Sequence, residues 1–66
     1  MRIKLLITTA SGKSYSSKVV DRSDEQCNKA IKRFGKREIF SIELSNEDFI
    51  IFNPDHVSHI EVRYGT

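Results

Sequence analysis

Hydrophobic and polar residues alternate over residues 2–8 of the chain. Ile3, Leu5 and Ile7 share one side of an extended backbone, and most of the residues between them are polar. A period of two is typical of a β-strand with one buried face. The turn signal Ala10-Ser11-Gly12 follows, and we expect a second, serine-rich strand over about residues 13–20, at an edge or solvated rim of the sheet.

The period changes to that of a helix over residues 23–35. One apolar stripe follows the spacing i, i+3, i+4, i+7: Cys27, Ala30, Ile31 and Phe34. Ser23 is expected to be the N-cap residue, in a capping box with Gln26. Gly35 is expected to lie just beyond the helix, where a left-handed conformation favours glycine.

Alternation with a period of two returns over residues 37–44. A short turn at residues 45–47 predicts a hairpin into a further strand at residues 48–53. The segment Phe49-Ile50-Ile51-Phe52 is apolar on both faces. We therefore expect it to lie in the centre of the sheet or to be covered by another molecule.

Pro54 ends this strand, because proline donates no amide hydrogen bond to a ladder. A single helical turn over residues 54–57 and a last strand over about residues 58–64 complete the pattern. The predicted order is β-β-α-β-β-β, an α+β fold with a mainly antiparallel sheet and one helix packed on a face. The length predicts one domain, residues 1–66.

A chain of 66 residues has room for only a small core. The single cysteine, Cys27, excludes an internal disulfide, and no cysteine–histidine cluster has zinc-like spacing. Self-association is the commonest remaining source of stability, so we expect a homo-oligomer. The expected interface is the doubly apolar strand: Phe49, Ile50, Ile51 and Phe52. The alternative is that the helix covers one face of this strand and a curled sheet covers the other.

Charge changes the picture, although the net charge is only +2. Residues 1–37 hold ten basic and three acidic side chains, a net +7, whereas residues 38–66 hold one basic and six acidic, a net −5. One basic cluster lies on and after the predicted helix: Lys29, Lys32, Arg33, Lys36 and Arg37. Such a cluster can bind phosphates or an acidic partner. Alternatively, it is a solvated helix face whose last-turn cations match the helix dipole.

Other candidate sites have weaker patterns. One set of metal-binding or proton-transferring residue types has no specific spacing: Asp55, His56, His59 and Glu61. Gly12-Lys13-Ser14 resembles the end of a phosphate-binding loop, but Ile7 stands where that loop needs its first glycine, and a strand follows. Cys27 is expected in the core. No catalytic arrangement can be assembled from these residues, so we expect neither an enzyme nor a cofactor.

The opening Met1-Arg2-Ile3-Lys4-Leu5 and the closing segment at residues 49–62 resemble small single-domain proteins of Firmicute bacteria and their phages. The strand, turn, strand ending is also similar to that of SH3-like and Sm-like small barrels, although the helix departs from a plain five-stranded barrel. The resemblance implies a phage or mobile-element accessory protein that acts by binding.

These observations lead to one expected function and one alternative. We expect a protein-interaction module that binds a host or viral protein, because the chain is small and combines a doubly apolar strand with two segments of opposite charge. We expect it in the cytoplasm, because no apolar run approaches the ~20 residues of a membrane span. The alternative is a nucleic-acid-binding protein that uses the basic helix at residues 24–37.

Overall fold

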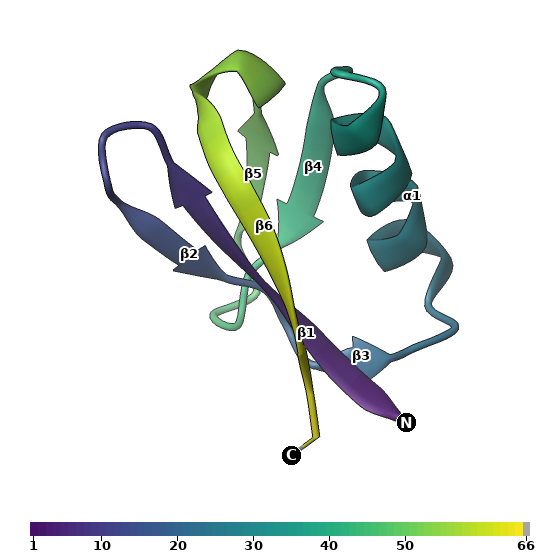
Figure 1. Cartoon of the computed structure of the whole chain (residues 1–66). Coiled ribbons are helices and arrows are strands. Elements are labelled where there is room, and N and C mark those ends of the chain that lie inside the picture. The colour runs from purple at the N-terminus through teal and green to yellow at the C-terminus, as the bar shows by residue number, and fades with distance from the viewer. Residues whose placement is uncertain (66) are drawn as a thin grey trace.

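The computed structural model describes residues 1–65, and Figure 1 shows their arrangement. The predicted α+β fold is confirmed, except that the second expected strand is divided in two. The elements follow in this order: β1 (Arg2–Thr9), β2 (Ser14–Ser16), β3 (Val20–Asp21), α1 (Glu25–Gly35), β4 (Phe40–Glu43), β5 (Phe49–Phe52), the 3-10 turn η1 (Pro54–His56) and β6 (Val57–Tyr64).

The strands form two antiparallel sheets. In the first, β1 pairs with β2, β3 and β6, and in the second, β4 pairs with β5. A single bridge between Ser17 and Leu44 connects the sheets. β4 lies between β5 and α1 (Figure 1), so the helix flanks the smaller sheet on the side away from β5.

The division between β2 and β3 has a local cause at residues 17–19. The backbone amide of Ser17 donates to the Leu5 carbonyl at 2.9 Å, but the next amide, that of Lys18, donates instead to the Glu43 carbonyl of β4 at 2.9 Å. The chain therefore leaves β1 and crosses to the second sheet. The first part of the serine-rich segment, β2, lies at an edge of the sheet as predicted, because within the described chain it pairs only with β1. Ser17 departs from the expected solvated rim, because it is only 6% exposed.

The core lies between the two sheets and the helix. It contains the inward side of β1, two inward residues of β4, and the apolar side of α1, together with Phe52 and Val57: Ile3, Leu5, Ile7, Cys27, Ala30, Phe40, Ile42, Phe52 and Val57. The rings of Phe40 and Phe52 stack with centroids 5.3 Å apart, and Phe34 meets Phe40 edge-on at 5.8 Å. The predicted apolar stripe of the helix is therefore the face that packs on β4.

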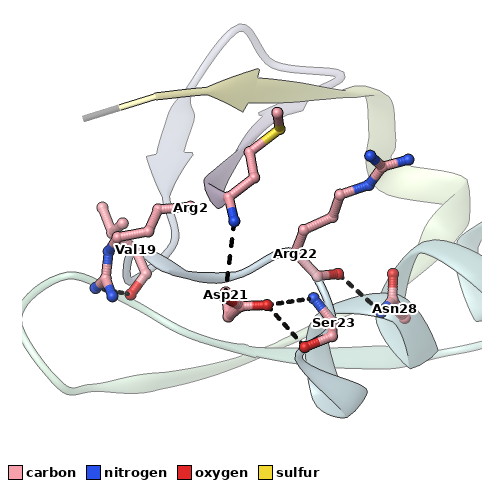
Figure 2. Close-up of polar contacts among 7 residues, drawn as sticks. Arg2, Val19, Asp21, Arg22, Ser23 and Asn28 are labelled. Atoms are coloured by element: carbon pink, nitrogen blue, oxygen red, sulfur yellow. Dashed lines mark hydrogen bonds and ion pairs between the residues drawn. The ribbon is translucent and has the colours of Figure 1, made fainter.

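The N-cap of α1 is Asp24 and not Ser23, which corrects the predicted capping box. The Cys27 amide donates to an Asp24 carboxylate oxygen at 2.9 Å. Figure 2 shows why Ser23 is not available: both its amide and its hydroxyl donate to Oδ1 of Asp21, at 2.9 and 2.7 Å. Asp21 thus fixes the turn between β3 and the helix, and capping moves one residue further along.

The carboxyl end of α1 also differs from the prediction. Gly35 lies within the helix, and Arg37 takes the left-handed conformation with φ of 58°. The Glu38 amide donates to the Arg33 carbonyl at 2.8 Å, and the Arg37 amide donates to the Phe34 carbonyl at 3.0 Å. These two bonds make a Schellman motif, which ends the helix and delays β4 until Phe40.

Candidate functional site

The doubly apolar strand β5 has one buried and one exposed face. Phe52 belongs to the core and Ile50 is half-buried, whereas Phe49 is 62% and Ile51 is 74% exposed. The expectation that β5 lies centrally in a sheet is wrong, because among residues 1–65 it pairs only with β4. Two large apolar side chains therefore face solvent on the outer face of the β4–β5 hairpin.

The backbone of β5 also has a free edge. The Leu44 amide donates to the Asp48 carbonyl at 2.7 Å, and ladder bonds recur at every second pair of an antiparallel hairpin. The bonds to β4 are therefore made by Ile50 and Phe52, and the backbone groups of the other two β5 residues point away from β4. Within the described residues, nothing else pairs with that edge. An unpaired edge of this kind is a template for another strand.

The basic residues of α1 and of its C-cap, Lys36, form a second surface, which we call the basic face: Lys29, Lys32, Arg33 and Lys36. They follow the spacing i, i+3, i+4, i+7, opposite the buried stripe, and all four are exposed. None forms an ion pair with another residue of the described chain. Arg37, the fifth predicted member, lies beyond the helix, and its guanidinium pairs with the Asp55 carboxylate.

A groove connects the two surfaces. It has a volume of about 230 Å³ and runs between α1 and the outer face of the hairpin. Its lining comes from both elements: Gln26, Lys29, Ala30, Arg33, Phe40, Ser41 and Phe49. The exposed ring of Phe49 thus shares one depression with two cations, and no acidic side chain lines it. This juxtaposition brings together residues about twenty positions apart, so no local sequence signal could have indicated it.

A smaller hollow of about 80 Å³ lies at the amino-terminal end of α1, between residues 17–20 and β4. Cys27 lines it together with Ser17 and Asp24. Burial, and secondarily the negative charge of Asp24, raises the pKa of the Cys27 thiol above its usual value of 9.0. A protonated, buried thiol is a poor nucleophile, so Cys27 acts as a small core residue.

The remaining candidates are dispersed. Among the described residues, no three His, Cys, Asp or Glu side chains are grouped so that they could hold a metal ion. Arg37 pairs with Asp55, and Arg63 pairs with Glu61 at 2.6 Å, while His56 and His59 are exposed. These acids are thus occupied by arginines.

The Gly12-Lys13-Ser14 segment does not form a phosphate-binding loop. Gly12 has φ of 92° in the turn between β1 and β2, and its amide donates to the Thr9 carbonyl at 2.9 Å. The strand β2 follows directly at Ser14, as the sequence predicted. The Lys13 ammonium lies 5.3 Å from the centre of the Tyr15 ring, on which it forms a cation–π contact.

Comparisons with protein-family models, with curated proteins and with solved structures found no match for this chain. Within residues 1–65, no helix is long and apolar enough to cross a membrane. The functional interpretation therefore depends on the surface itself, which combines an unpaired strand edge, two exposed apolar side chains and an adjoining basic face.

Proposed function

We propose that this chain is a non-enzymatic protein-interaction module that first associates with a second copy of itself, through the free edge of β5. One observation carries this proposal. Phe49 and Ile51 are exposed on a strand whose backbone is unpaired along one side. Proteins normally protect such an edge with charges, proline or a covering element, and none of these occurs between Phe49 and Phe52.

The geometry of β5 suits pairing with itself. In an antiparallel pair, residues that exchange hydrogen bonds stand directly opposite each other. If a two-fold axis passes through Ile50, Phe49 stands opposite Ile51 of the partner subunit, and the reverse contact forms by symmetry. The backbone groups that point away from β4 then bond across the axis. Four apolar side chains meet on one face of a continuous four-stranded sheet.

The expected affinity is modest. Each subunit contributes two side chains, which lie beside those of the partner on one face of the sheet and keep their outer surfaces exposed. Each therefore contributes only part of the about 1.5–3 kcal/mol of full burial. Association itself costs at least ~4 kcal/mol in lost freedom of motion. We therefore expect a dissociation constant on the order of micromolar rather than nanomolar. A host or viral protein that presents a strand to the same edge would compete with the second copy.

Light scattering after size exclusion, from about 1 to 200 micromolar, tests the proposal. We expect the mass to rise from 7.6 kDa toward twice that value as concentration increases, at low and high salt alike. Ile51→Asn should shift the midpoint at least tenfold to higher concentration. Ile39→Asn is the matched control, because Ile39 is 58% exposed but lies outside β5. A monomer throughout, or an assembly larger than a dimer, contradicts the proposed pairing.

A further inference from the structure

The basic face of α1 offers a row of charges that no carboxylate neutralises in the described chain. Residues three and four apart on a helix have Cβ atoms roughly 5–6 Å apart. Lys29, Lys32, Arg33 and Lys36 therefore form a continuous line of cations along the helix. Contacts to phosphate need charge and reach more than a fixed motif, and this line provides both.

The groove adds what a row of charges lacks. Phe49 presents an exposed ring opposite Lys29 and Arg33. The side chains of Gln26 and Ser41 also line the groove, and neither hydrogen-bonds to another described residue. An aromatic ring for stacking, cations for the backbone and free polar groups for base edges are the components of a single-strand binding groove.

We propose that the groove between α1 and the β4–β5 hairpin binds single-stranded nucleic acid, with phosphates on the basic face and one base stacked on Phe49. A paired base is held in its own stack and cannot lie on this ring, so a duplex would use the cations alone. An acidic peptide would also use the cations, but it needs an apolar contact rather than an aromatic one. The carboxylate nearest to Phe49 along the hairpin is that of Glu43, its cross-strand partner, and it pairs with Lys18 at 3.9 Å. This ion pair reduces the repulsion between Glu43 and a phosphate bound in the groove.

The first test uses the fluorescence anisotropy of a labelled 12-nucleotide oligothymidine. Single-strand binding loses affinity with a log–log salt slope of about −0.7 per phosphate contact, so four contacts predict a slope near about −3. The double substitution Lys29→Gln with Arg33→Gln should weaken binding at least tenfold and reduce the slope by about 1.4. The control is Lys4→Gln with Lys13→Gln, which removes the same charge outside the groove and should leave the slope unchanged.

The second test separates stacking from charge. Phe49→Leu should weaken oligothymidine binding about tenfold, whereas Phe49→Trp should retain it, because stacking needs a flat ring. Oligoglutamate of matched charge should bind more weakly and should not respond to Phe49→Leu. No anisotropy change at low salt, equal binding of oligoglutamate, or equal effects of the charge variant and its control would overturn the proposal.

This inference and the proposed pairing of β5 can fail separately. Ile51→Asn does not alter the groove lining, so it should weaken dimerisation and leave the affinity for the 12-nucleotide strand unchanged. Loss of nucleic-acid binding in the monomeric Ile51→Asn variant, at matched concentration, would overturn the proposed binding by the groove of one subunit. It would leave the proposed pairing of β5 standing.

Discussion

The hydroxyl oxygen of Ser17 accepts a hydrogen bond from the backbone amide of Leu5 at 2.7 Å. Leu5 is completely buried, and its amide faces the point where the chain leaves β1 between β2 and β3. The side chain of Ser17 therefore takes the place of the missing backbone carbonyl. Its own hydroxyl hydrogen goes to the Lys18 carbonyl at 3.1 Å. One serine thus allows the strand to cross from one sheet to the other without an unpaired buried donor.

Ser17→Ala should be among the most destabilising small substitutions in this chain. It removes the acceptor for the Leu5 amide and leaves a buried donor without a partner, which costs about 1–3 kcal/mol. Urea unfolding followed by circular dichroism measures the change. Ser16→Ala is the control, because no hydrogen bond of its side chain occurs within residues 1–65, and it should cost much less. Equal losses for the two variants would show that the Ser17 hydroxyl bond is not important.

Glu47→Gly should stabilise the protein. Glu47 closes the β4–β5 turn with φ of 72°, and its amide donates to the Leu44 carbonyl at 2.9 Å. A left-handed conformation costs a non-glycine residue about 1–2 kcal/mol, and glycine removes this cost. Part of the gain is lost again, because glycine has greater conformational freedom in the unfolded chain. We expect a net gain of about 0.5–1 kcal/mol in thermal or urea unfolding. Glu47→Ala, which keeps the Cβ atom, should give no gain, and an equal gain from it would contradict the backbone explanation.

Asp21 should make stability depend on acid pH. The Ser23 amide and hydroxyl donate to its carboxylate and, with the nearby amino terminus, hold its pKa below the usual 3.8 (Figure 2). A lowered pKa contributes stability that is present above the unfolded value and is lost as pH falls through the folded one.

The measurement is the melting temperature of the wild type and of Asp21→Asn between about pH 6 and pH 2. The wild type should lose more than the variant below pH 3.8, and the two curves should run parallel above pH 5. Glu38→Gln serves as the control, because the structure gives this exposed carboxylate no hydrogen bond, and it should follow the wild type. Parallel wild-type and Asp21→Asn curves throughout would contradict the assigned role.

The Cys27 thiol should report the opening of the helix from the sheets. Because it is buried and its pKa is raised, a thiol reagent at pH 8 should react at least about a hundredfold more slowly with folded than with urea-unfolded protein. Ser17→Ala should accelerate labelling, because it weakens the adjoining contact between β1 and the crossing strand. Rapid labelling of the folded wild type would place the thiol at the surface, contrary to the structure.

Local pattern was sufficient for most of the fold. The apolar stripe from Cys27 to Phe34 predicted the buried face of α1, because helix periodicity depends only on neighbours along the chain. The helix ends were displaced by competing local interactions that composition does not rank. Asp21 binds Ser23, so Asp24 becomes the N-cap, and Arg37 takes the left-handed conformation that was expected of Gly35.

The sequence predicted only part of the candidate site. Helical spacing predicted the basic face, since exposure opposite an apolar stripe follows from geometry. The position of Phe49 beside Lys29 depends on the register of β4 with β5 and on how α1 packs, which are tertiary properties. The sequence of a strand that is apolar on both faces does not indicate whether its second face is covered or exposed. The pairing of Arg37 with Asp55 is equally long-range.

Side chains in a pleated strand alternate between faces, and this alternation has a further consequence for β5. Phe49 and Ile51 point to the face on which the groove opens, so two copies joined at this edge present both grooves on the same side of one sheet. A single strand long enough to reach both would bind the second groove at a high effective concentration. Avidity would then appear only with longer oligonucleotides, and those oligonucleotides would in turn favour the dimer by linkage.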